Sequence, residues 1–459
     1  MDIKERTLKI GDTLKKWLQL LGVGANGANS TGIAELSHAQ ELKNIEALPE
    51  SYRANFELGT PADSDEFIGR EKQLSSIENI FSGWLAGSSA RFAIHGLPGS
   101  GRSSLVNVAL DKNNTNNQQT LSTHISIKDT SYQAGKLVNA IATSLELNLA
   151  DSNVASNNDD GTAALEGLIE QLNDSPRRVI VLHRCHNLFV RDVGGYEAVR
   201  ALQRLSTATS PNVLWIMTFD SFALQLLNRI VSFSDCLTDT IALGPIEVEV
   251  GQQLIEARHN ESTLPITFYS GSRGQPGDAL SDQDTARKRF FADLNHVACG
   301  NPLAAQFHWL ASLSYEDGAL KAFRPNVMAA PALDSLTFDQ LTVLTMVLQQ
   351  AEVSPADLAK TFGWDKLLAD QLLGTLLRRG LLKRRNGNTL RVNPVMVEHL
   401  AAELSRQRLL QQQPKLMSHH QLREQVKRQA YGYASGIRTV AEQQSSNIFS
   451  RMDQRGGQR

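Results

Sequence analysis

From residue 63 to residue 247, short apolar runs alternate with longer stretches whose apolar residues recur at helical spacing. The runs "RFAIHG", "RRVIVLHRC" and "NVLWIMTF" are mostly apolar and bounded by polar residues, which is typical of strands buried on both faces. "LSTHISI" and "TDTIALGPI" indicate two further strands, and "SSLVNVAL" has helical spacing. Strands separated by helices predict an α/β core over residues 63–247, with a parallel sheet between two layers of helices.

The pattern changes after this core. Residues 248–332 are mostly helical in pattern, and we expect a helical lid there. Residues 333–404 show three helical stretches, with Ser354 and Asp365 where N-caps are expected, and then two short strands around the hairpin dipeptide Asn386-Gly387. Three helices followed by a hairpin predict a C-terminal winged-helix domain.

The two ends of the chain differ in character. Residues 7–22 place Leu14, Trp17 and Leu18 at helical spacing, so we expect an amphipathic helix within residues 1–22 that docks on the protein or a partner, with membrane-surface contact as an alternative. Residues 23–62 contain "GVGANGANSTG" and are interpreted as a linker. Residues 405–459 hold ten Lys and Arg against three Asp and Glu. This basic tail indicates an anionic partner, or a solvated end that keeps the protein in solution.

Composition narrows the class of protein. The chain has 459 residues, of which 41% are hydrophobic and 20% charged, and a formal net charge of -2. These values are ordinary for globular proteins with several domains. The three cysteines are far apart in the sequence, which argues against a disulfide framework. Because there is no apolar run of about 18 residues and no apolar signal core, we expect a cytoplasmic protein.

The stretch "IHGLPGSGRSS" carries the clearest chemistry. It lies between a predicted strand and a predicted helix, and it has the spacing of a phosphate-binding loop, G-x-x-x-x-G-K-[ST]. In such loops backbone N–H groups turn toward phosphates, the helix N-terminus adds partial positive charge, and the first hydroxyl ligates Mg²⁺. We therefore expect ATP or ADP here, with Ser103 as a weak Mg²⁺ ligand. The residues of the expected site are Gly96, Pro98, Gly99, Gly101, Arg102, Ser103 and Ser104.

Arg102 stands where this loop pattern has lysine. Arginine keeps the positive charge, but its planar guanidinium is not the compact point charge that a lysine ammonium provides. With arginine at this position, we expect nucleotide binding to be retained and the positioning of a transition state to be impaired.

Two further segments resemble AAA+ ATPases of the origin-recognition type and the related STAND signalling ATPases. "DEFIGREKQL" is similar to the segment that borders the adenine, which implies that Ile68 and Gly69 lie near the base. "VIVLHRCHNLF" is similar to the Walker B motif, and His183 and Arg184 hold the places of its two acids. A bacterial group with the pattern D-x-x-H-x-L-F…GG looks most similar, since His186 fits its histidine.

The resemblance extends along the chain. "VLWIMTF" is similar to the sensor-1 strand, with Thr218 at its polar tip. "LLNRIVSFSDCLTDTIALGPI" is similar to the segment that carries an arginine finger for a neighbouring subunit, and Arg229 is the candidate. "ACGNPLAAQFHWLAS" is similar to the lid helix with the sensor-2 arginine, whose position holds Leu303. The resemblance implies a P-loop AAA+ core, a lid and a winged helix, with degenerate Walker A and Walker B motifs.

Several residues admit a second interpretation. His183, Cys185 and His186 could suggest a metal site, but neighbours on a strand point to opposite faces and no second cluster has ligand spacing, so core side chains are favoured. Arg229 could instead form a surface ion pair. Basic residues gather where the third helix of the winged helix meets the hairpin and are candidates for nucleic-acid contact or for protein contact. They are Arg378, Arg379, Lys383, Arg384 and Arg385.

Three functions follow from these observations. The first is a regulatory or assembly protein that binds ATP or ADP with weak or absent hydrolysis and acts through protein partners or a homo-oligomer, because the acids that would order Mg²⁺ and activate water are missing. The second is a DNA-binding ATPase of replication, transposition or defence. The third is an adaptor that binds no nucleotide.

Overall fold

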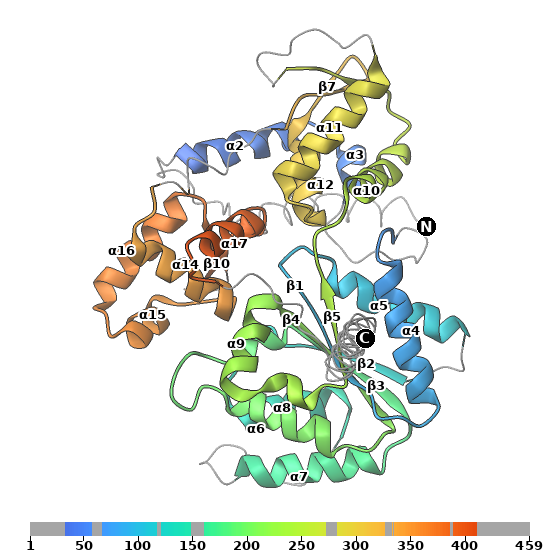
Figure 1. Cartoon of the computed structure of the whole chain (residues 1–459), viewed down its shortest axis with the longest axis vertical. Helices are drawn as coiled ribbons and strands as arrows, with labels where there is room; N and C mark the ends of the chain where they lie inside the picture. The colour runs from blue at the N-terminus through green and yellow to red at the C-terminus, as the bar shows by residue number, and fades with distance from the viewer. Residues whose placement is uncertain are drawn as a thin grey trace, which may run out of the picture.

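The computed structural model describes residues 33–56, 67–116, 121–147, 160–271, 282–325, 333, 335–385 and 389–410. Its centre is a five-stranded sheet in the order β2-β3-β4-β1-β5, with every neighbouring pair parallel (Figure 1). The strand β4 is buried along its whole length, as its apolar sequence predicts. The predicted α/β class with a parallel sheet is confirmed. The strands are β1 (Arg91–Gly96), β2 (Leu121–Ser126), β3 (Arg178–His183), β4 (Val213–Asp220) and β5 (Asp239–Leu243).

Helices cover both faces of this sheet. Phe92 and Ile94 of β1 pack with α4 (Glu71–Leu85) and α5 (Arg102–Asn116). Ala93 belongs to the core on the opposite face, because side chains alternate along a strand. The helices of that second layer are α6 (Ala134–Ser144), α7 (Asp160–Asn173), α8 (Glu197–Ala208) and α9 (Ser221–Val231). Since the strands are parallel, their carboxyl ends share one edge, and the loop after β1 begins there.

The region after β5 combines helices with a small sheet. Its helices are α10 (Val248–Asn260), α11 (Gln283–Ala298) and α12 (Pro302–Ser312). A three-stranded sheet in the order β6-β8-β7 adds to the helices that the sequence predicts. Runs of three or four residues are too short for an alternating pattern to be recognised. The strands are β6 (Ile266–Phe268), β7 (Leu313–Glu316) and β8 (Ala319–Ala322).

Residues 33–56 are folded, in contrast to the linker expected over residues 23–62. They contain α2 (Ile33–Glu46) and α3 (Glu50–Ala54), and α2 packs on α12 (Figure 1). Tyr52 is buried in the core of the lid, where its hydroxyl accepts a hydrogen bond from Trp309 Nε1 at 3.0 Å. Residues 33–56 therefore share one core with the region after β5, and we call these two parts of the chain, residues 33–56 and the described residues of 248–325, the lid.

The C-terminal part begins with three helices, α14 (Phe338–Gln350), α15 (Pro355–Phe362) and α16 (Lys366–Arg378). An antiparallel pair, β9 (Leu382–Arg384) and β10 (Leu390–Val392), follows, and α17 (Val397–Arg406) ends it. Ser354 and Asp365 cap α15 and α16, as expected. The order of elements is the predicted one, while the turn at Asn386-Gly387 lies outside the described residues. We call residues 335–410 the C-terminal domain.

Two sequence predictions fall on other undescribed residues. They are the amphipathic helix of residues 1–22 and all but the first six residues of the basic tail, residues 405–459. Among the helices in the described ranges, none combines the length and the apolar character needed to cross a bilayer.

Candidate functional site

The glycine-rich stretch lies where the sequence places it, between the end of β1 and the start of α5. Gly99 and Gly101 have φ angles of +87° and +92°, a conformation that glycine adopts without strain. A Cβ on Gly96 would come 2.3 Å from Ser100 Oγ, whereas a Cβ on Gly101 would meet nothing within 4 Å. The turn is therefore tightly packed on its inner side and open at Gly101, next to the N-terminus of α5. This is the arrangement that a phosphate-binding loop requires.

The segment expected near the base lies against this loop and against the lid. Gly69 has a φ of +84°, and a Cβ there would come 2.0 Å from Val250 Cγ1 of α10. The buried Arg70 side chain donates to the Gly244 carbonyl at 2.7 Å and to the Ser100 carbonyl at 3.4 Å. Gly69 and Arg70, the residues next to Ile68, consequently lie between the loop and α10.

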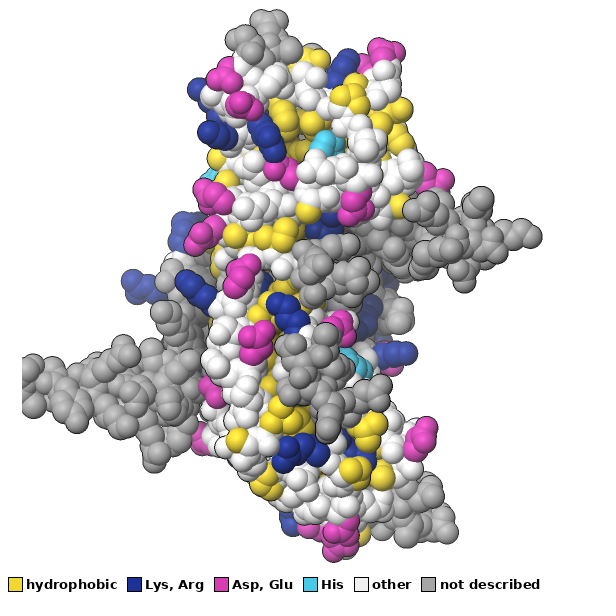
Figure 2. Space-filling model, turned by 90° about the vertical axis from the view of Figure 1, so that its right-hand side faces the viewer, with side chains coloured by type: hydrophobic (Ala, Val, Ile, Leu, Met, Phe, Trp, Pro, Cys, Tyr) yellow, Lys and Arg dark blue, Asp and Glu magenta, His cyan; other side chains and the backbone are white. Residues whose placement is uncertain are grey.

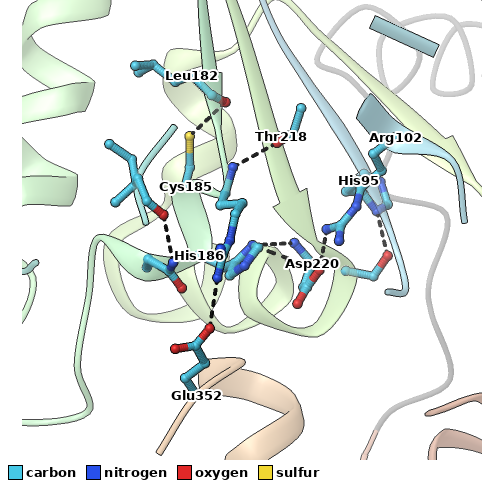
Figure 3. A network of polar contacts seen from close by, with 12 residues as sticks. His95, Arg102, Leu182, Cys185, His186, Thr218, Asp220 and Glu352 are labelled. Carbon is cyan, nitrogen blue, oxygen red and sulfur yellow. Dashed lines mark hydrogen bonds and ion pairs between the residues drawn. The ribbon is translucent and has the colours of Figure 1, made fainter. Parts of the chain in front are cut away.

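The first residue of α5 forms an ion pair with a carboxylate that the sequence did not single out. Arg102 contacts Asp220, the last residue of β4, and Asp220 stands in register with Gly96 of β1 (Figure 3). Asp220 is buried; burial raises its pKa, but the charges of Arg102 and other nearby basic groups outweigh burial and hold the pKa below its usual range. A carboxylate therefore stands beside the loop, on β4 and not on β3.

The two residues at the places of the Walker B acids point to different surroundings. His183 stacks on His124 of β2, with the two rings 5.3 Å apart, and burial lowers its pKa to about 4. Arg184 has a left-handed backbone, φ 62°, and its N–H donates to Thr218 Oγ1 at 2.9 Å. Its guanidinium donates to Glu352 Oε1 of the C-terminal domain at 2.8 Å. Only Arg184 reaches the neighbourhood of the loop, and Thr218 positions its backbone.

The residues that could have suggested a metal site have separate polar contacts. The Cys185 thiol is buried and donates to the Leu182 carbonyl at 3.4 Å. His186 Nδ1 accepts from the Asp220 N–H at 3.3 Å (Figure 3), and burial lowers its pKa to about 4. The described residues contain no group of three or more His, Cys, Asp or Glu side chains that could hold a metal ion. These side chains support the edge of the sheet.

A second buried histidine lies directly before the loop. His95, the last residue before Gly96, has its Nδ1 3.0 Å from Ser221 Oγ at the start of α9 (Figure 3). Burial lowers its pKa to about 4, and the charge of Arg102 lowers it further. His95 is therefore neutral at pH 7 and joins β1 to α9.

The lid and the C-terminal domain both contact the loop. Asn301, at the N-cap of α12, donates its side-chain amide to the Pro98 carbonyl at 2.9 Å. Leu303, which the resemblance predicts at the sensor-2 position, is so near that a Cβ on Gly99 would come 2.7 Å from its Cβ. Leu97 is buried in the core cluster of the C-terminal domain. The loop is thus where three parts of the chain meet.

The remaining candidates do not form one basic surface. Lys383 is buried, and its pKa lies well below its usual range because of burial and the charge of Arg391. Arg385 forms an ion pair with Glu352 and faces the core. Arg378 and Arg384 are exposed, whereas Arg379 is half-buried and donates to the Ser335 carbonyl at 3.3 Å. The expected cluster is therefore corrected, because two of its five members point inward.

The exposed surface is mixed in charge on the side of the molecule away from the C-terminal domain. On the face shown in Figure 2, Lys and Arg side chains are interspersed with Asp and Glu and do not gather in one region. Arg229 is exposed near the C-terminal end of α9. The other loop residues, Ser103 and Ser104, lie in the first turn of α5, and Ser103 is exposed.

No family model and no curated protein matches the chain. Solved structures do. The chain is similar to Cdc6p from Pyrobaculum aerophilum, with 14% identity over 79% of this chain and 99% of that one, at a TM-score of 0.38. It is similar to the Orc2 protein of Aeropyrum pernix, solved as ADPNP–ADP complexes, with 11% identity over 77% and 97% of the two chains, at 0.38. It is also similar to the Orc1 protein of the same organism in complex with DNA, with 14% identity over 75% of this chain and 95% of that one, at a TM-score of 0.39.

Proposed function

We propose that this chain binds ATP or ADP at the loop of residues 96–104 and acts as an AAA+/STAND-like regulatory or assembly protein. The observation that carries the proposal is the junction itself: an open glycine turn at the end of a central parallel strand, followed by Arg102 as the first residue of a helix. Anions bind at such junctions because backbone N–H groups, the helix dipole and a basic side chain all face the same point.

The same site has little means to hydrolyse the nucleotide. Attack by water on the γ-phosphate needs a residue that orients or deprotonates it. His183 is turned toward His124, and Arg184 cannot accept a proton at pH 7. Asp220 is engaged by Arg102. We therefore propose weak or absent hydrolysis, a pseudo-ATPase.

A bound nucleotide would act through the packing of the lid and of the C-terminal domain. Asn301 of the lid and Leu97 in the C-terminal core both depend on the shape of the loop. A ligand that changes the loop shifts the balance between arrangements of these parts, to the extent that it binds one arrangement better. Partner proteins or further copies of the chain would bind to that arrangement, and Arg229 would contact the bound molecule. Protein contact is favoured over nucleic acid because Lys383 and Arg385 face inward.

The test is to denature the purified full-length protein, identify any nucleotide released, and measure ATP turnover in parallel. We expect ATP or ADP at a substantial fraction of one per chain, no turnover, and loss of both nucleotide and rebinding in Arg102→Ala. The matched control is Arg177→Ala, because Arg177 lies just before β3, at the opposite edge of the sheet, and packs over Trp84. Turnover that Arg102→Ala abolishes would establish an active ATPase. A protein that neither carries nor binds nucleotide would be an adaptor.

A further inference from the structure

Four guanidinium groups gather at the carboxyl edge of the sheet, around two buried carboxylates. Arg102 pairs with Asp220, while Arg184 and Arg385 share Glu352. The fourth is the half-buried Arg391 of β10, which interacts electrostatically with Arg184 and Asp220. Its Nε is buried and has no hydrogen-bond partner in the described part of the chain.

The cluster therefore carries more positive than negative charge. Glu352 is 7% exposed in its side chain and is already shared between two arginines. The exposed Asp129 also acts on Arg184, but water screens an exposed charge. His186, which touches Asp220, is neutral at pH 7 because burial lowers its pKa to about 4. An excess of half-buried guanidinium charge beside an open glycine-rich loop favours an anion.

A divalent cation fits this donor set poorly. Mg²⁺ takes oxygen ligands, and in phosphate loops it combines a Ser or Thr hydroxyl and substrate phosphates with carboxylates close by. Ser103 offers a hydroxyl, but the places of the Walker B acids hold His183 and Arg184. The carboxylate beside the loop, Asp220, is engaged by Arg102. A Mg²⁺ ion here would stand among guanidinium groups that repel it.

We propose that the negative charge of the bound nucleotide is balanced by Arg102 and Arg184, with Arg391 behind them, and that nucleotide binding is independent of Mg²⁺. This inference rests on the proposed nucleotide site. Guanidinium groups suit the task because they stay charged and donate two parallel hydrogen bonds to phosphate oxygens. Phosphates would then compete with Asp220 for Arg102 and with Glu352 for Arg184.

The experiment is calorimetric titration of the nucleotide-free, full-length protein with ATP and with ADP, once in excess MgCl₂ and once in EDTA at matched ionic strength. We expect Kd values within about twofold of each other in the two buffers, because the arginines replace the cation's charge. Binding that weakens about tenfold or more in EDTA would overturn the inference and leave the nucleotide site in place. Absence of binding in both buffers would overturn the nucleotide site as well.

Variants separate charge balance from general damage to the fold. Arg184→Gln should raise the Kd about tenfold in EDTA and to a similar degree in Mg²⁺. Arg391→Gln is the second variant, with a smaller effect of the same sign, and Arg177→Gln at the far edge of the sheet is the control with an unchanged Kd. Circular dichroism and thermal unfolding confirm that each variant is folded. Full affinity of both folded variants in EDTA would overturn the inference.

Discussion

Asn301 of the lid donates its side-chain amide to the Pro98 carbonyl of the glycine-rich loop at 2.9 Å. The same side chain caps α12 through the N–H groups of Leu303 and Ala304. It also shares a hydrogen bond with Glu398 of α17. One buried amide therefore connects loop, lid and C-terminal domain, and a movement of any of the three changes the partners available to it.

Replacing Asn301 by serine should separate these roles. Serine keeps an oxygen that can cap α12 but lacks the amide that reaches Pro98. We expect a loss of about 1 kcal/mol in the free energy of unfolding, since the Pro98 carbonyl and the Glu398 side chain lose this hydrogen-bond partner. Nucleotide affinity should fall about threefold, because the loop is less preorganised. Urea unfolding and calorimetric titration measure the two effects.

The control for that variant is Asn301→Ala. Alanine removes the cap as well, at a further cost of about 1 kcal/mol. If serine and alanine destabilise the protein equally, the contacts of the amide with Pro98 and Glu398 account for the role of Asn301, and its capping of α12 adds nothing. If serine changes neither stability nor affinity, the contact with Pro98 has no energetic weight.

Neutralising Asp220 should have opposite effects on stability and on ligand binding. Asp220→Asn leaves Arg102 without its buried partner, which should cost about 3 kcal/mol in the free energy of unfolding. Phosphates would no longer compete with a carboxylate for Arg102, so nucleotide affinity should rise about tenfold. The matched control is Asp235→Asn, an exposed aspartate before β5, at the other edge of the sheet. Weaker nucleotide binding in Asp220→Asn would show instead that the carboxylate helps to hold the ligand.

The sheet could be predicted because its strands are buried on both faces. Runs such as "VLWIMTF" leave no other assignment once helical stretches separate them. The loop could be predicted because its turn needs positive φ angles, which glycine adopts without strain, and the spacing of these glycines is visible in the sequence. Asp220 was missed because it comes one residue after the apolar run. The rule that parallel strands end at a common edge would have found it if applied to β4 as well as to β3.

The pairing of charges could not be predicted in the same way. Lys383 and Arg385 look exposed in a basic hairpin, yet Arg385 meets Glu352 of the C-terminal domain where that domain contacts Arg184. Lys383 interacts electrostatically with Glu41 of α2, more than 300 residues earlier in the chain. Residues 33–56 were themselves expected to be a linker, so nothing in the hairpin's sequence indicated what covers it.

The shared carboxylate of Glu352 should couple the C-terminal domain to the core. Glu352→Gln leaves Arg184 and Arg385 without their buried counter-charge, and we expect a loss of about 3 kcal/mol in the free energy of unfolding. In a double-mutant cycle with Arg184→Gln, the interaction energy should be about 2 kcal/mol. The control is Asp192→Asn, since the pair of Asp192 with Lys360 joins the same two regions at an exposed site and should contribute nothing measurable. If the losses in the free energy of unfolding from Glu352→Gln and Arg184→Gln simply add in the double variant, the coupling is contradicted.

Lys383 tests the corrected view of the hairpin. Its Nζ is buried and has no hydrogen-bond partner among the described residues. Lys383→Met should therefore raise the free energy of unfolding by about 1 kcal/mol, because an apolar side chain of similar length avoids the cost of burial. Any affinity for duplex DNA should stay the same in this variant and fall in Arg384→Gln, whose side chain is exposed. A loss of DNA affinity in Lys383→Met would return this lysine to the nucleic-acid candidates.

Glu398 should make the stability of the protein depend on pH. Burial raises its pKa from the ordinary value of 4.5 to about 7, and the hydrogen bond with Asn301 offsets only part of this. Between these two pH values the folded state holds a proton that the unfolded state has released, so stability falls as the pH rises from about 4.5 to about 7 and is level above that.

In Glu398→Gln, which resembles the protonated form, this fall should be absent. The buried histidines His95, His183 and His186 change stability in the opposite sense over this range, since burial lowers their pKa values to about 4, but they are common to both proteins and cancel in the difference. The variant should therefore match the parent near pH 4.5 and exceed it by about 2–3 kcal/mol at pH 8, as measured by urea unfolding across that range. A difference that does not vary with pH would mean that Glu398 is ionised throughout, and that its contact with Asn301 is between a charged carboxylate and the amide that holds the loop.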